Sequence, residues 1–175
     1  VGSLTTLKGD VFLAENTSGE ILITDNVHVY AYDYNQDIFY SSVTGADNPL
    51  DYPFDTSGYC SFQNGRFIVA VNGTQQWALS LLGSVSQANF FSDTNQSQVG
   101  LIQSKPGYVQ AAVPVPGGGN NLLVFGTAVA ESWQDVGAAL FPYQRNSTFN
   151  IDYGCLNPSS IASLDNIVVW LGVNS

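Results

Sequence analysis

The chain has 175 residues, a formal net charge of −10 at neutral pH and a charged fraction of only 10%. A chain of this length folds as one domain that buries roughly 68–70% of its unfolded surface. Its 45% hydrophobic and 13% aromatic content is too high for a disordered chain. The only basic residues are Lys8, Arg66, Lys105 and Arg145. This composition argues against direct, sequence-specific binding of nucleic acid, and no apolar run approaches the ~18 residues that insert into a membrane.

The first forty residues predict a four-stranded meander. Short runs rich in Val, Ile, Phe, Tyr and Thr, separated by turn residues, predict strands at 11–16, 20–25, 28–34 and 37–43. In the third strand, alternation places Val29, Ala31 and Asp33 on one face. The other face then carries His28 with Tyr30, Tyr32 and Tyr34.

A second meander is predicted after a connection rich in Pro and Asp at 44–58. Its strands are expected at 59–63, 66–71, 75–81 and 88–92. The turn Asn64-Gly65 begins a hairpin whose Phe67, Val69 and Val71 are expected to share one packed face. After a polar stretch at 93–107, further strands are predicted at 108–117, 121–127, 129–136, 159–165 and 166–173.

A turn followed by an apolar run occurs four times, starting at Asp25, Asn64, Gly119 and Asp165. The intervals of about 40, 55 and 45 residues are close to the ~40–50 residues of one four-stranded propeller blade. The sequence therefore predicts one all-β domain, 1–175, a β-propeller-like array of four-stranded antiparallel meanders. Its expected blades are 11–43, 59–92, 108–136 and a truncated 159–175, which favours an incomplete propeller taken from a longer protein. Chance likeness between unrelated hairpins is the alternative.

Few residues suggest chemistry. His28 is the only histidine and lies in a strand pattern. A Ser-His-Asp triad would have to use this residue, and a metal site with several histidine ligands is excluded. The glycine-rich segment 116–121 lacks the Lys-Ser/Thr of a phosphate-binding loop and predicts a hairpin turn. The segment 33–37 imitates the start of a calcium loop, but Ile38 and Thr44 replace the required Gly and Glu. The sequence nominates no catalytic, cofactor-binding or metal-ligating residue, and no cofactor.

Two groups of residues leave a binding function open. Asp47, Asp51 and Asp55, with Tyr52 and Phe54, suit a site for a sugar or a cation, or else a loop whose aromatic rings pack inward.

Four aromatic residues are expected at the surface, where they would suit a protein or carbohydrate partner: Tyr30, Tyr32, Tyr34 and Trp77. Cys60 and Cys155 are expected to be free, half-buried thiols, with one disulfide as the alternative.

The segment 122–172 carries a series of short motifs in a fixed order. They are Phe125-Gly126, Glu131-Ser132-Trp133, Gly-x-x-Leu-Phe-Pro at 137–142, Gly154, Ser159-Ser160-Ile161 and the strand NIVVWLG at 166–172. In this order they resemble the packaged DNA stabilisation proteins of short-tailed bacteriophages, also called tail accessory or head-closure factors. The segments ILITDNVHVYAYD and GYCSFQNGRFIVAV, followed by QQWALS, resemble the preceding blades of that family more weakly.

The resemblance implies a structural virion protein and not an enzyme. Members of the family form a multi-subunit ring below the portal, close its channel and help to retain packaged DNA. The implied partners are other tail or portal-side proteins, and the implied location is the virion tail, after assembly in the host cytoplasm. The chain is much shorter than a full member, and its acidity suggests plugging of the channel instead of charge neutralisation. The alternatives are a carbohydrate-binding propeller or host-attachment fibre domain, and a glycosidase-like propeller.

Overall fold

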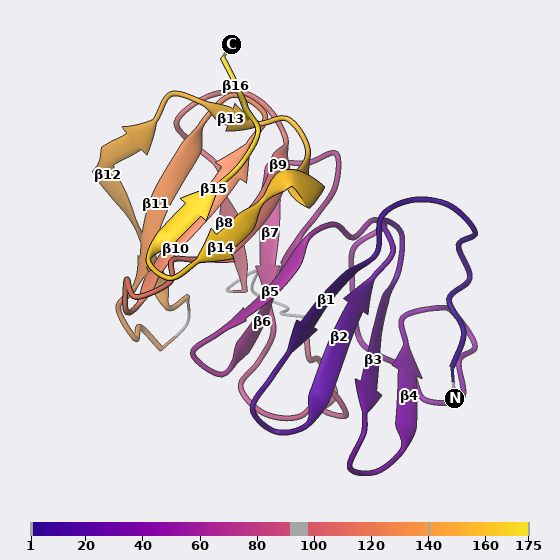
Figure 1. Ribbon diagram of the computed structural model, residues 1–175. Coiled ribbons are helices and arrows are strands. Elements are labelled where there is room, and N and C mark those ends of the chain that lie inside the picture. The colour runs from indigo at the N-terminus through magenta and orange to yellow at the C-terminus, as the bar shows by residue number, and fades with distance from the viewer. Residues whose placement is uncertain (1, 92–97, 140, 175) are drawn as a thin grey trace.

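The protein is an all-β, propeller-like array of four-stranded antiparallel meanders, as predicted (Figure 1). The computed structural model describes residues 2–91, 98–139 and 141–174. This part of the chain contains no α-helix, and its sheets form an open array and not a closed barrel. In each four-stranded sheet, the order of the strands is their order in the chain.

Three sheets and a C-terminal unit make up the array. The first sheet comprises β1 (Phe12–Glu15), β2 (Glu20–Thr24), β3 (Val29–Asp33) and β4 (Ile38–Ser41). The second comprises β5 (Cys60–Gln63), β6 (Arg66–Ala70), β7 (Gln76–Leu79) and β8 (Val99–Leu101). The third comprises β9 (Val109–Pro114), β10 (Asn121–Gly126), β11 (Ala130–Asp135) and β12 (Tyr143–Ile151). The C-terminal unit comprises β13 (Gly154–Cys155), the short 3-10 helix η1 (Pro158–Ser160), β14 (Ala162–Leu164), β15 (Ile167–Val169) and β16 (Gly172–Val173).

The sheets meet along their first strands. β1 contacts β5, and β5 in turn contacts β9, so the first strand of each meander lies on the inner side of the array (Figure 1). Later strands of each meander lie farther out, as in the blades of a propeller. The C-terminal unit continues the series, because β13 contacts β10 of the third sheet.

The fourth strands of the second and third sheets differ from the sequence prediction. Residues 88–91 of the predicted strand 88–92 form turns, where Phe90 and Phe91 are buried core side chains; residue 92 lies outside the described residues. The strand that pairs with β7 is β8, within the stretch predicted as a connection. β12 was missed because most of its residues are exposed and polar, so the sequence lacks an apolar alternation there.

The four sequence repeats are not structurally equivalent. The turns at Asn64 and Gly119 precede β6 and β10, the second strands of their sheets. The turn at Asp25 instead precedes β3, a third strand. The hairpin turn at Asn64-Gly65 is confirmed, because both residues have positive φ, 51° and 81°, as a two-residue type I′ turn requires.

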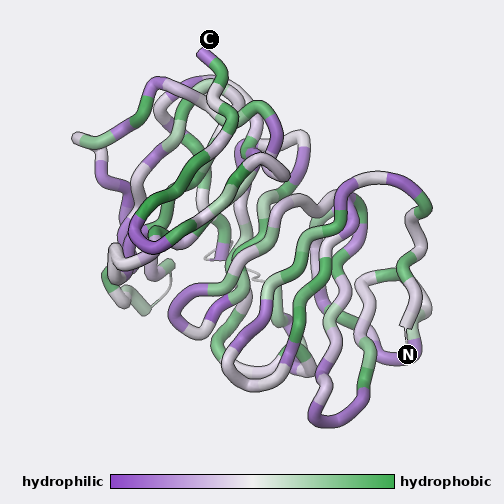
Figure 2. Tube along the Cα trace, viewed as in Figure 1, coloured by the Kyte–Doolittle hydropathy of each residue, from purple (hydrophilic) through white to green (hydrophobic). Residues whose placement is uncertain are grey.

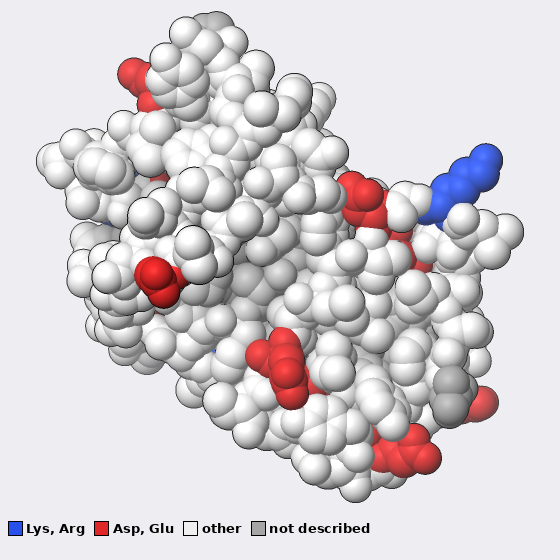
Figure 3. All heavy atoms as spheres, in the orientation of Figure 1, with Lys and Arg blue, Asp and Glu red and all other residues white. Residues whose placement is uncertain are grey.

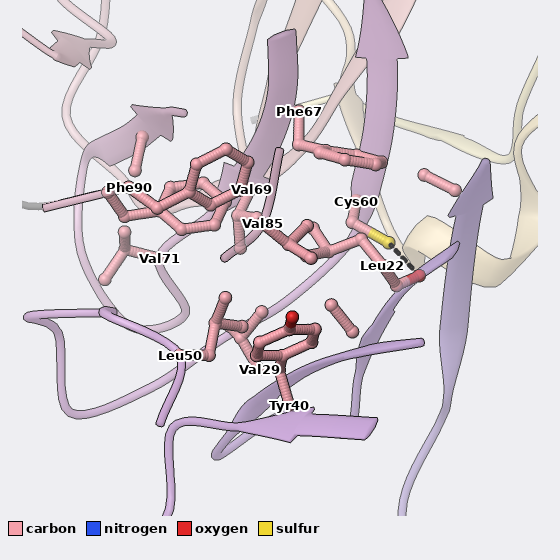
Figure 4. Packing of buried hydrophobic residues seen from close by; sticks show 14 residues of the cluster. Leu22, Val29, Tyr40, Leu50, Cys60, Phe67, Val69, Val71, Val85 and Phe90 are labelled. Carbon is pink, nitrogen blue, oxygen red and sulfur yellow. Dashed lines mark hydrogen bonds between the residues drawn. The ribbon is translucent and has the colours of Figure 1, made fainter. Parts of the chain in front are cut away.

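The core lies between the sheets. Phe67, Val69 and Val71 share one face of the β6 segment, as predicted, and pack with Leu22 and Val29 of the first sheet (Figure 4). The other face of β6 packs against the third sheet, so this strand is buried on both sides. Full burial of side chains of this size stabilises the fold by about 1.5–3 kcal/mol each.

The two cysteines are free thiols, as predicted, but both are buried and not half-buried. Cys60 belongs to the core between the first and second sheets. Cys155 belongs to the core between the third sheet and the C-terminal unit. Burial raises the pKa of Cys60 to about 12.

Candidate interaction surface

Asp25 organises the polar groups around His28 and Tyr30. Its carboxylate accepts hydrogen bonds from the Thr6 hydroxyl (2.6 Å), the Tyr30 hydroxyl (2.9 Å) and the backbone N–H of His28 (2.7 Å). Burial acts to raise the pKa of Asp25, but these hydrogen bonds outweigh it and hold the pKa below its usual value. His28 is half-buried, and its Nδ1 lies 3.2 Å from the Thr5 hydroxyl. This cluster fastens residues 5 and 6 to the first sheet.

Glu131 is a fully buried carboxylate that sequence reasoning noted only as part of a motif. It accepts hydrogen bonds from the backbone N–H groups of Gln103 (2.8 Å) and Ser104 (2.6 Å), and from Trp133 Nε1 (3.1 Å). The Arg145 guanidinium lies 3.6 Å away. Because these partners come from β11, β12 and the connection before β9, Glu131 joins two strands of the third sheet to the connection that precedes it.

Trp77 does not lie at the surface as predicted. It is fully buried between the second and third sheets, where its ring contacts Trp133 (centroids 5.3 Å apart) and Tyr143 (5.5 Å). The prediction was wrong because β7 belongs to the middle of the three four-stranded sheets, and the third sheet covers the face from which Trp77 projects. Tyr30 is also fully buried.

The predicted surface positions of Tyr32 and Tyr34 are confirmed in part. Tyr32 is half-buried and donates a hydrogen bond to Asp37 (2.9 Å). Tyr34 is exposed and donates one to Glu15 (3.0 Å). These hydrogen bonds to carboxylates raise the pKa of both phenols.

The three spaced acids do not form one carboxylate cluster. Asp47 and Asp55 are exposed and Asp51 is half-buried. Tyr52 and Phe54 pack inward on the first core, with the Tyr52 ring 5.4 Å from that of Phe91. The inward-packing alternative for this loop is therefore confirmed.

Two other kinds of feature are absent from the described ranges. No three side chains among His, Cys, Asp and Glu gather as a candidate metal site in residues 2–91, 98–139 and 141–174. Within the same ranges, no helix has the length and apolar character needed to cross a membrane.

The β14–β15 hairpin carries apolar side chains on its outer face. Ala162 pairs with Val169 and Leu164 with Ile167, and alternation along each strand puts these four side chains on one face. Leu164, Ile167 and Val169 are 71%, 60% and 54% exposed. We call Ala162, Leu164, Ile167 and Val169 the hairpin face; Figure 2 shows apolar segments along this hairpin, at the outside of the array.

The opposite side of the hairpin is anchored to the third sheet. Val168 and Trp170 pack on the core that contains Phe125 and Cys155. The Trp170 ring lies 5.0 Å from that of Phe125, and its Nε1 donates a hydrogen bond to the carbonyl of Gly154 (3.2 Å). An apolar hollow of about 360 Å³ lies beside the hairpin, lined by Ile151, Tyr153, Val168, Val169, Trp170 and Gly172.

An outer sheet surface of this kind is unusual. Antiparallel sheets with one solvated face normally place polar side chains on that face. Contiguous exposed apolar patches mark surfaces that bind proteins, ligands or membranes. The view in Figure 3 shows few charged side chains, mostly isolated acids (red). The uninterrupted apolar run at 167–171 is the sequence signal for a strand covered on both faces, although the run alone does not show what covers the second face.

No family model and no curated protein matches the chain. Among solved structures, the chain is similar to the computationally designed Ika8 protein, with a TM-score of 0.52 and 11% identity, over 93% of this chain and 42% of that one. It also matches KlHsv2 with loop 6CD replaced by a Gly-Ser linker, with a TM-score of 0.43 and 8% identity, over 91% of this chain and 43% of that one. The chain thus spans less than half the length of either protein. At these identities the likeness to Ika8 supports the fold alone.

Proposed function

We propose that this protein is a structural subunit that acts through protein–protein contacts in a larger assembly. The observation that carries the proposal is the hairpin face, because its three large side chains are more than half exposed while the other side of the hairpin is anchored. Completing the burial of each would stabilise a complex by roughly 1–2 kcal/mol, since full burial of such side chains contributes about 1.5–3 kcal/mol.

We propose that the assembly is the tail of a short-tailed bacteriophage, where the subunit would help to close the portal channel and retain packaged DNA. The resemblance over residues 122–172 supports this role. Its central motif residues, Glu131 and Trp133, are buried and hydrogen-bonded to each other, which suits a structural role. With a net charge of −10, the subunit would retain DNA by obstruction and by repulsion.

Purified virions of the phage that encodes the chain provide the test. The proposal predicts that mass spectrometry detects the protein in tailed particles. It also predicts that particles assembled without the protein lose their packaged DNA, and that supplying the protein in trans restores retention. Virions that lack the protein, or heads that stay full without it, would refute this role.

A second candidate, carbohydrate binding, rests on a separate polar hollow of about 200 Å³ on the third sheet. It is lined by Asn121, Ser132, Gln134, Gln144, Arg145 and Asn146. Uncharged amide and hydroxyl groups suit the hydroxyls of a sugar, because they both donate and accept hydrogen bonds. A glycan array tests this candidate: specific binding that Gln134→Ala removes and Gln75→Ala keeps would favour it, whereas an array without binding would exclude it.

A further inference from the structure

The first sheet has a second apolar face at the opposite end of the array. Its register aligns Leu13 with Ile23, and Ile21 with Tyr32, which in turn lies opposite Phe39. Since the alternate residues Ala14, Leu22 and Ala31 point into the core, these five side chains point away from it. Leu13 is 64% exposed, and the other four are half-buried. We call them the outer face of the first sheet.

The start of the chain covers only part of this outer face. The Thr5 backbone N–H donates to the Tyr30 hydroxyl (3.0 Å), and Gly2 lies so close to the Phe39 ring that it has no room for a side chain. Both contacts are with β3 and β4. On the side formed by β1 and β2, Leu13 remains 64% exposed, and Ile21 and Ile23 remain partly exposed.

We propose that two copies of the chain close a ring, in which the hairpin face of each copy packs on the outer face of the other copy's first sheet. This inference rests on the proposed role as an assembling subunit and names its nearest partner. Within one chain, apolar sheet faces already pack on each other in series from the first sheet to the C-terminal unit. The hairpin face and the outer face of the first sheet lie at the two ends of this series, and among the described residues no sheet lies opposite either of them.

Contact between unlike faces is heterologous, and such contacts form closed rings or open polymers according to the rotation between copies. Two copies fit the length of the similar fold: the chain matches 42% of the designed Ika8 protein, so two copies together would match 84% of it. A pair would contain two equal contacts and would cover both apolar end faces.

Charge is compatible with this contact at short range. Two carboxylates lie at the edge of the outer face, those of Glu15 and Asp37, and they already accept hydrogen bonds from Tyr34 and Tyr32. The four side chains of the hairpin face are uncharged. Because each copy carries a net charge of −10, the copies repel each other over longer distances, and added salt is expected to strengthen the pair by screening.

Sedimentation velocity of the full chain tests the proposal with one variant for each face. The wild type is expected to sediment at twice the mass of one chain, with the dimer fraction rising with salt. Leu13→Glu and Ile167→Glu are each expected to sediment as monomers. Their equimolar mixture should recover heterodimers, because one contact then joins two unaltered faces. Leu82→Glu, at a 56% exposed side chain outside both faces, is the matched control and should remain dimeric.

A wild type that stays monomeric, or that forms open polymers, would overturn the two-copy ring. So would a dimeric Ile167→Glu variant, since the contact would then not involve the hairpin face. A mixture that is as monomeric as its components at every concentration would also overturn it, since the one unaltered pair of faces would then give no attraction. Far-ultraviolet circular dichroism with a thermal melt confirms that each variant is folded. A monomeric chain that is present in virions would overturn this inference alone, whereas a dimer that is absent from virions would overturn only the phage role.

Discussion

Leu164 and Ile167 lie opposite each other across the β14–β15 hairpin, and both side chains point away from the core. On the other side of the same hairpin, Val168 and Trp170 pack on the core. The hairpin is therefore fixed in place while it presents apolar groups to the outside. An exposed apolar face on an anchored hairpin is typical of a docking surface. A displaced core segment would lack the anchoring contacts.

The first prediction concerns these two residues. Replacing Leu164 or Ile167 by Glu is expected to change the free energy of unfolding of the monomer by no more than about 0.5 kcal/mol, because exposed side chains contribute little to folding. Urea unfolding at low protein concentration checks this value. A loss comparable to that of a buried apolar side chain, about 2–5 kcal/mol, would show that the hairpin face belongs to the core.

Glu131→Gln is expected to destabilise the fold by roughly 3 kcal/mol. The substitution removes the charge that faces Arg145 and weakens the acceptor for two backbone N–H groups, and breaking a buried ion pair costs about 3–5 kcal/mol. Asp152→Asn is the matched control. It breaks the surface pair with Lys105 and should cost about 0–1 kcal/mol. Equal urea midpoints for the two variants would contradict the structural role of Glu131.

Trp77→Ala is expected to destabilise the protein by about 3–5 kcal/mol, as large cavities in a core do. The side chain is fully buried and contacts three aromatic rings, so its removal leaves a void between the second and third sheets. Thermal unfolding measures the loss, with Trp77→Phe as a smaller truncation that should retain more of the stability. A Trp77→Ala variant with unchanged stability and altered ligand binding would restore the surface interpretation.

Asp25→Asn is expected to destabilise the protein in a way that depends on pH. The folded-state pKa of Asp25 lies below its usual value, so its stabilising effect is present above pH ~4 and is lost as the pH falls through the folded-state pKa. The difference in unfolding free energy between wild type and variant should therefore shrink in acid. Urea titrations at neutral and at acid pH measure it; a difference that is constant with pH would contradict this coupling.

Cys60 is expected to resist thiol reagents in the folded protein. Burial raises its pKa to about 12, so the reactive thiolate is scarce at neutral pH, and the core also blocks access. Because the folded-state pKa is the higher one, the associated stability is present below pH ~8.5 and is lost as the pH rises through about 12. Labelling with a disulfide reagent, with and without urea, checks the prediction; mass spectrometry should find label on Cys60 only in urea.

Much of the fold was predictable because turn residues and short apolar runs are local signals. The Asn64-Gly65 turn and the packed face of Phe67, Val69 and Val71 were correct in detail, since positive φ and two-residue alternation are properties of the segment itself. β12 was missed because its exposed polar side chains carry no alternation. The apolar pair Phe90-Phe91 predicts a strand, but in the structure both side chains are buried in the core from a turn.

The candidate surface was harder to predict because exposure is a property of the whole array. Trp77 and Tyr30 have the residue types of a binding surface, yet neighbouring sheets or the start of the chain cover them. Leu164 and Ile167 have the residue types of a core, yet nothing in the described part of the chain covers the face that they form. Local pattern indicates which face of a strand is apolar, but only the packed structure shows which apolar face has no partner.

Hydroxyl-radical footprinting of the protein, first isolated as a monomer at low concentration and then in its native assembly, tests the central claim most directly. The structure predicts that Leu164, Ile167 and Val169 become protected on assembly while Leu82, exposed elsewhere, stays reactive. Unchanged reactivity of the three hairpin residues in the assembly would contradict the claim that the hairpin face is the contact surface.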